Sequence, residues 1–150
     1  MREILFRGKR KDNGEWIYGV PITDESTNDV YIITSTAGAS LKSEINNMCA
    51  TGFRAIPETV EPYTGLTDKN GTRIFEGDII KSEQDGMIGV IRFGEYQTTN
   101  SGNGECHLGF SIEWYGKYSD LLRRDLGWWV IFGNTDINIF GNIHDNPELM

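Results

Sequence analysis

The 150-residue sequence has little cysteine and no long apolar run. Its two cysteines, Cys49 and Cys106, have no second cysteine at the spacing of a metal site or redox motif. No window approaches the ~18 apolar residues of a membrane span, and the apolar stretch at the N-terminus is too short for a signal peptide. These absences predict two buried thiols and a cytoplasmic protein that does not contact the membrane.

Motifs for catalysis or metal binding are also missing. His107 follows Cys106 and His144 precedes Asp145, which gives four potential zinc ligands, but the 36 residues between the two histidines match no known zinc-finger or protease spacing. Neither histidine has a nucleophile motif beside it. The sequence therefore predicts no metal, no cofactor and no catalytic residue, although these absences leave an enzyme open.

Basic residues are outnumbered by acidic ones, 14 to 22, so the net charge is −8. Residues 1–11 hold five basic residues and one acidic residue, a balance of +4 that leaves −12 for the rest. Such an acidic body repels a phosphate backbone and disfavours non-specific DNA binding. The basic cluster is either a phosphate contact or a charged strand that discourages edge pairing; it comprises Arg2, Arg7, Lys9, Arg10 and Lys11.

Glycine, in contrast, is abundant, and its 18 residues are spread along the chain, which predicts many tight turns and a mainly β fold. Residues 4–9 and 16–20 flank the pair Asn13-Gly14, a strong hairpin signal. Residues 30–34 are apolar and β-branched, and predict a further strand.

The second half of the chain continues the β pattern. Residues 72–80 and 87–93 predict a second hairpin, and the region around residues 74–93 has the pattern of an SH3-like barrel element. Residues 94–104 are polar and predict a mobile loop. Residues 108–114 alternate apolar and polar side chains, which predicts a half-buried strand.

Two short helices are also predicted. Apolar spacing favours one helix at about residues 38–50. Residues 119–126 begin with a capping serine and precede Gly127, which predicts the other helix. We therefore expect one domain over residues 1–150, built from antiparallel strands in a small barrel-like or sandwich assembly.

Aromatic residues exceed what a small core must bury, and we predict that Trp16, Tyr18, Trp128 and Trp129 include partner-binding residues. Consecutive side chains of a strand point to opposite faces, so one of the two adjacent tryptophans would face outward if residues 128–132 form a regular strand. An exposed tryptophan suits a protein interface or a stacked base. The alternative is that the second ring packs under the predicted helix at 119–126.

Four sequence stretches carry a family resemblance: REILFRGK at 2–9, ETVEPYTGLTDKNGTRIFEGDII at 58–80, GVIRFG at 89–94, and FGNIHDNPELM at 140–150. In this order they resemble the YopX family of bacteriophage and prophage proteins. The resemblance implies a phage-encoded origin, a host-cytoplasmic location and a mainly β fold. It supplies no catalytic or ligand residue. The polar stretch at 36–52 and the pair Trp128-Trp129 depart from the family pattern.

These observations favour a non-enzymatic module that binds a host or phage protein. One alternative is a nucleic-acid-binding small barrel that uses the basic N-terminal strand and the aromatics. Another is an acidic DNA mimic, whose −12 body would occupy a basic enzyme. A homo-oligomer is compatible with all three, because strand edges and surplus aromatics need cover.

Overall fold

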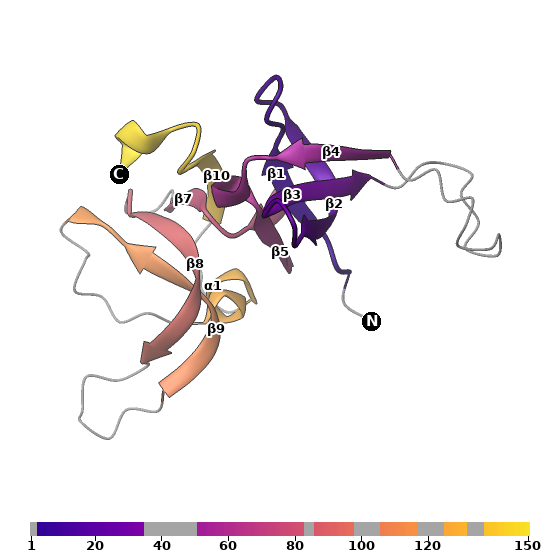
Figure 1. Cartoon of the computed structure of the whole chain (residues 1–150). Coiled ribbons are helices and arrows are strands. Elements are labelled where there is room, and N and C mark those ends of the chain that lie inside the picture. The colour runs from indigo at the N-terminus through magenta and orange to yellow at the C-terminus, as the bar shows by residue number, and fades with distance from the viewer. Residues whose placement is uncertain (1–2, 35–50, 83–85, 98–105, 117–124, 132–136) are drawn as a thin grey trace. The chain divides into compact units, whose positions relative to one another are not determined.

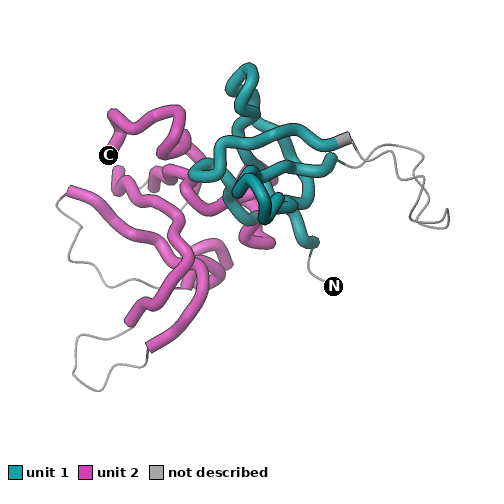
Figure 2. Tube along the Cα trace, in the orientation of Figure 1, with its two compact units in different colours: residues 1–62 teal, residues 63–150 magenta. Residues whose placement is uncertain are grey.

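The computed structural model describes residues 3–34, 51–82, 86–97, 106–116, 125–131 and 137–150. The chain forms two compact units, residues 1–62 and residues 63–150 (Figure 2). Antiparallel strands make up most of the described residues (Figure 1), which confirms the mainly β prediction. The predicted helix at 38–50 lies outside the described residues. That the chain is a single domain stays a prediction.

The first unit is built around a sheet with the strand order β4-β3-β2-β1. Its strands are β1 (Phe6–Lys9), β2 (Trp16–Asp24), β3 (Asp29–Thr34) and β4 (Thr51–Ala55), followed by the 3-10 turn η2 (Pro57–Thr59). The β1–β2 hairpin, in which Lys9 pairs with Trp16, forms around the Asn13-Gly14 turn as predicted. Gly14 has a positive φ of 75°, the conformation for which glycine is suited there.

Close backbone approach shapes this sheet. A Cβ atom on Gly19 would lie 2.1 Å from the carbonyl oxygen of Ile33, and one on Gly8 would lie 2.6 Å from Cδ1 of Ile32. Ile32 is fully buried between these strands. Beyond β1, a bridge joins Arg10 to Ala55, so the end of the first hairpin also meets β4. The sheet is therefore strongly curved, with glycine where side chains do not fit.

The chain passes into the second unit within β5 (Glu61–Thr67). In the second unit β5 pairs with β6 (Arg73–Phe75), and a four-stranded sheet has the order β10-β7-β8-β9. Its strands are β7 (Asp78–Ser82), β8 (Ile88–Gln97), β9 (Cys106–Trp114) and β10 (Ile137–Asn142), and the turn η4 (Pro147–Leu149) follows. The predicted strands and the second hairpin are confirmed, whereas the SH3-like assignment of residues 74–93 stays a prediction.

One apolar core lies within the second unit. Its eight buried residues come from β6, β7, β8, β9, β10, the β7–β8 turn and the helix α1 (Leu126–Ile131): Ile74, Ile80, Met87, Ile91, Ile112, Trp114, Leu126 and Ile137. The alternation predicted for residues 108–114 is confirmed, because Ile112 and Trp114 are buried and Phe110 packs against the same core.

Of the helix predicted at 119–126, the structure describes only Asp125 and Leu126. The helix α1 begins at Leu126, and the Oδ1 atom of Asp125 accepts a hydrogen bond from the backbone N–H of Trp128 at 3.2 Å. Asp125 is thus the N-cap residue, and Gly127, which we expected to end a helix, lies in the first turn. Residues 119–124 lie outside the described residues.

The predicted loop at 94–104 begins too early. β8 continues to Gln97, and its last residues pair with β9 through Gly94↔Gly109, Tyr96↔His107 and Gln97↔Cys106. Tyr96 is the buried apolar side chain of this stretch, and the polar residues around it hid the strand signal. Residues 98–105 lie outside the described residues.

Candidate functional site

The outward side of the first unit's sheet carries an exposed apolar surface. Alternate residues of β2 point to this side, and Tyr18, Val20 and Ile22 keep 50%, 50% and 55% of their surface exposed. The register places Ile33 opposite Val20 and Tyr31 opposite Ile22 on β3. We call these five residues, Tyr18, Val20, Ile22, Tyr31 and Ile33, the β2–β3 face.

The β2–β3 face extends toward β4, where Gly52 borders it. Gly52 of β4 pairs with Ile33, and a Cβ atom on Gly52 would lie 2.7 Å from Cδ1 of Ile33. The isoleucine side chain therefore lies over the glycine and extends the apolar surface toward β4. Exposed contiguous apolar surface on a sheet is typical of an interaction site.

Two basic residues and one aromatic residue lie beyond the Tyr18 end of the β2–β3 face: Arg7, Lys9 and Trp16. The guanidinium carbon of Arg7 lies 4.7 Å from the ring centre of Trp16, and the Nζ atom of Lys9 lies 5.5 Å from it. Both distances are within the range of a cation–π contact. Trp16 is half-buried as a result, so two cations partly cover the first predicted partner-binding residue.

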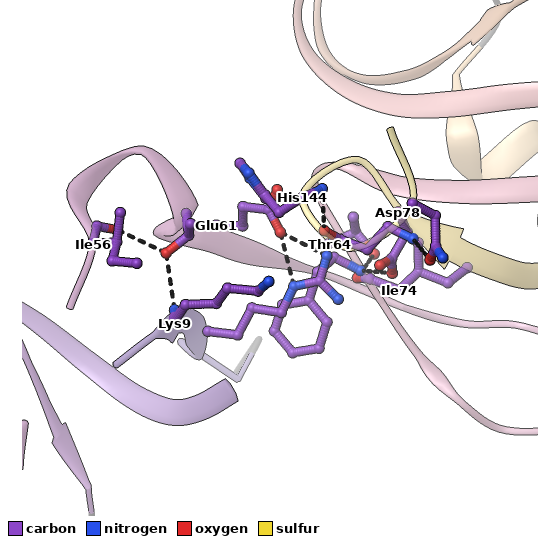
Figure 3. A network of polar contacts seen from close by, with 12 residues as sticks. Lys9, Ile56, Glu61, Thr64, Ile74, Asp78 and His144 are labelled. Atoms are coloured by element: carbon purple, nitrogen blue, oxygen red, sulfur yellow. Dashed lines mark hydrogen bonds and ion pairs between the residues drawn. The ribbon is translucent and has the colours of Figure 1, made fainter. Parts of the chain in front are cut away.

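Arg7 is itself buried beside an acidic partner. Its Nε and Nη2 atoms donate to Oε2 of Glu61 at 2.8 and 2.6 Å, and both side chains are nearly inaccessible. The adjoining backbone is fixed by Thr59, whose Oγ1 accepts from the Lys9 N–H at 2.9 Å and donates to the Ile56 carbonyl at 2.7 Å (Figure 3). Arg7 is thus a structural residue, and its guanidinium is not accessible to a phosphate.

The opposite border of the face is acidic. Asp24 and Asp29 pair at the end of the β2–β3 hairpin, and Arg54 forms an ion pair with Asp29. Hydrogen bonds from the Ser26 side chain and backbone hold the pKa of Asp24 below its ordinary value, so this carboxylate is ionised at neutral pH. The face therefore has a mainly basic border at one end and a mainly acidic border at the other.

The remaining basic residues of the N-terminal cluster lie at a small open cavity. The cavity has a volume of about 340 Å³ and is lined by Lys11, Asp12, Phe53 and Arg54. Arg10 stacks on Phe53 at 4.1 Å and donates from Nε to Asp12 at 2.9 Å. Arg10 therefore has a carboxylate partner, as Arg7 does. Arg2 lies outside the described residues.

The tryptophan pair of the second unit lies on a helix instead of a strand, so the two rings are not forced onto opposite sides. Trp129 packs edge-on against the core residue Trp114 at 5.2 Å, and Trp128 packs edge-on against Trp129 at 5.1 Å. Trp128 keeps 38% of its surface exposed. One ring of the pair therefore packs on the core and the other reaches solvent.

The potential zinc ligands Cys106, His107 and His144 lie in different environments. Cys106 is an exposed free thiol, which differs from the buried thiol that we expected, and His107 stacks on Tyr96 at 5.5 Å. The backbone N–H of His144 donates to Asn142. Within the described ranges no group of three or more histidine, cysteine, aspartate or glutamate residues is arranged to hold a metal.

Of the β2–β3 face, sequence reasoning singled out Tyr18 and did not include Val20, Ile22, Tyr31 and Ile33. The signal was present, because residues 16–22 are apolar or small on both sides of the strand. A strand with one solvent-exposed side should alternate apolar and polar residues. An unbroken run in a small sheet should have been interpreted as a core side plus an apolar outer side.

The antiparallel sheets define a mainly β protein. The model of the YopX protein family matches residues 5–150, and the chain belongs to this family. The match spans both units. No curated protein matches the chain significantly. In the described part of the chain, no helix has the length and apolar character needed to cross a membrane.

Proposed function

We propose that the chain is a non-enzymatic protein-binding module and that the β2–β3 face is its binding surface. The single observation that carries the proposal is the exposure of Tyr18, Val20 and Ile22 in one row on β2. Side chains of this kind form the centre of protein interfaces, where burying apolar area contributes about 25 cal/mol per Å². The partner would be a host or phage protein, and the module would act in the host cytoplasm.

The borders of the face suit a polypeptide partner. A mainly basic border at Trp16 and a mainly acidic border at Asp24 and Asp29 would orient a strand or helix that carries charges of opposite sign at its two ends. A uniformly anionic nucleic acid would meet the acidic border unfavourably. The carboxylate partners of Arg7 and Arg10 also argue against the nucleic-acid alternative.

Affinity capture with a matched pair of variants tests the proposal. Val20→Lys places a charge in the centre of the face, and Ile4→Lys makes the same change in charge at a residue of the same unit that is 72% exposed and lies outside the β2–β3 face. We expect proteins from the native cells to co-purify with the unmodified chain and with Ile4→Lys. Val20→Lys should lose them, with affinity reduced at least about tenfold.

The outcome is decisive only for folded variants, so circular dichroism of both should match the unmodified chain. Retention of the same proteins by Val20→Lys would overturn the proposal. Capture of nucleic acid in place of protein, with binding that weakens steeply as salt rises, would support the nucleic-acid alternative instead.

A further inference from the structure

The turn of the first hairpin and strand β4 form the walls of the open cavity in the first unit. The backbone N–H of Lys11 donates to the Arg54 carbonyl at 2.9 Å. This contact places Lys11 and Asp12 beside Phe53 and Arg54, and the four residues line a volume of about 340 Å³. Ligand pockets begin at about 300 Å³, so the cavity has room for a small ligand or for one residue of a peptide.

Two cations that line this cavity keep unused hydrogen-bond donors. Among the described residues, the Nζ atom of Lys11 has no ion pair or hydrogen bond. Arg54 forms its ion pair with Asp29 through Nη2, and its side chain is 45% exposed. A guanidinium has N–H donors on all three nitrogens, so Nε and Nη1 of Arg54 remain available within the described part of the chain. An anion in the cavity can therefore contact both cations without displacing Asp29.

The charge balance at the cavity defines the kind of anion. Asp12 accepts from Nε and Nη2 of Arg10 at 2.9 and 2.5 Å, and the hydrogen bond from Arg10 lowers the pKa of Asp12, so its carboxylate is ionised at neutral pH. The lining residues and their ion-pair partners thus comprise three cations and two carboxylates, an excess of one positive charge. This excess matches a carboxylate, whereas a phosphate dianion would leave negative charge facing two aspartates.

Phe53 supplies an apolar wall. Its ring is only partly buried, and the guanidinium carbon of Arg10 lies 4.1 Å from the ring centre, a cation–π contact that stabilises the ring position. An apolar body attached to a carboxylate can contact this ring while the carboxylate meets Lys11 and Arg54. The cavity therefore offers one charged and one apolar contact to the same ligand.

We propose that this cavity binds a carboxylate carried on an apolar body, supplied either by the C-terminal residue of a polypeptide or by a small aromatic acid. The planar guanidinium of Arg54 suits two-point contact with a carboxylate, and the ammonium of Lys11 adds a point charge. The site goes beyond the β2–β3 face, since none of the five residues of that face lines the cavity.

Titration with N-acetyl-phenylalanine, followed through backbone amide chemical shifts, tests the site. This probe joins one carboxylate to one apolar ring, and its carboxamide is the uncharged match. We expect the acid to shift the amides of residues 11–12 and 53–54 saturably, with a dissociation constant of roughly 1 mM, and the carboxamide to bind at least about fivefold more weakly. Tighter binding of phenyl phosphate than of the acid would contradict the charge balance.

Three variants sharpen the test. Lys11→Gln removes the unpaired cation and should raise the dissociation constant of the acid at least about threefold, whereas Asp12→Asn removes a negative charge from the wall and should lower it. Lys81→Gln is the matched control in the second unit, because Lys81 is also an exposed cation beside an aromatic ring, with Nζ 5.2 Å from the ring centre of Phe140. It should leave the affinity unchanged.

The proposal is overturned by the absence of a saturable shift at residues 11–12 and 53–54, by equal binding of acid and carboxamide, or by equal affinity of the unmodified chain and Lys11→Gln. A hexapeptide that ends in phenylalanine distinguishes the two sources of the carboxylate. Tighter binding than the acid supports a polypeptide terminus, and equal or weaker binding supports a small acid. The proposed function is tested by Val20→Lys, which does not line the cavity, so either proposal can fail without the other.

Discussion

The two units place their apolar side chains differently. Among the described residues of the first unit, the buried aliphatic residues are Ile32 and Ala55, while β2 exposes three apolar side chains in a row. The second unit buries eight residues in one core, and its exposed large apolar residues, among them Phe93, Leu108, Trp128 and Phe140, come from several different elements. The first unit therefore relies on close backbone contact and a buried ion pair, and part of its apolar surface is exposed on β2.

This comparison predicts that the largest loss of stability comes from the second unit's core. Trp114→Ala should lower the free energy of unfolding by about 4 kcal/mol, because it removes a buried ring and leaves a cavity beside Trp129. Hydrogen exchange should accelerate mainly in peptides from residues 63–150. Trp128→Ala, at the exposed end of the same cluster, should cost about 1 kcal/mol. Equal effects would contradict the core assignment.

The buried ion pair should dominate the stability of the first unit. Glu61→Gln leaves the guanidinium of Arg7 buried without a counter-charge, which costs about 3 kcal/mol. Peptides from residues 1–62 should then exchange faster. Asp12→Asn removes the exposed partner of Arg10 and should leave the unfolding midpoint unchanged. If the two substitutions behave alike, Arg7–Glu61 is not a structural pair.

The close approach of Gly19 to the Ile33 carbonyl should have a smaller effect on the stability of the same unit. Gly19→Ala forces a Cβ atom toward the Ile33 carbonyl and should cost about 2 kcal/mol, measured by chemical denaturation. Gly109→Ala in β9 is the control, since its nearest neighbour, Cε1 of Tyr96, would be at an ordinary 3.8 Å. A stable Gly19→Ala variant would show that the first sheet is less tightly curved than described.

The smallest effect concerns Tyr96 in the second unit. Burial, and then the neighbouring Asp125 carboxylate, raises the pKa of its phenol above the ordinary value of about 10. The neutral phenol is therefore favoured in the folded chain, and its contribution to stability is present below pH ~10 and lost as the pH rises through the folded-state pKa. Tyr96→Phe should weaken this alkaline loss; an identical pH profile would contradict it.

Much of the fold could be predicted from local signals. Asn13-Gly14 marks the first hairpin, and alternation in residues 108–114 identifies β9 and its buried side. The α1 helix was not predicted at Leu126–Ile131, because Asp125 and Gly127 suit a helix end as well as a helix start, and local pattern does not distinguish the two.

The candidate site was only partly predictable for a similar reason. Tyr18 stood out as an aromatic residue, but whether Val20 and Ile22 face a core or solvent depends on which side of the sheet other strands cover. The pairing of Arg7 with Glu61 joins residues 54 positions apart, and no local pattern indicates it. The exposure of Val20 and Ile22 and the pairing of Arg7 with Glu61 both depend on strand order, which single-sequence reasoning did not supply.

Photo-crosslinking from the β2–β3 face tests the central claim most directly. A benzophenone side chain at Tyr18, introduced in the native cells, should give a discrete adduct with one protein that resists nuclease treatment. The same group at Ile4 should not give that adduct. No adduct from Tyr18, or an adduct that nuclease removes, would contradict the account of this face as a protein-binding surface.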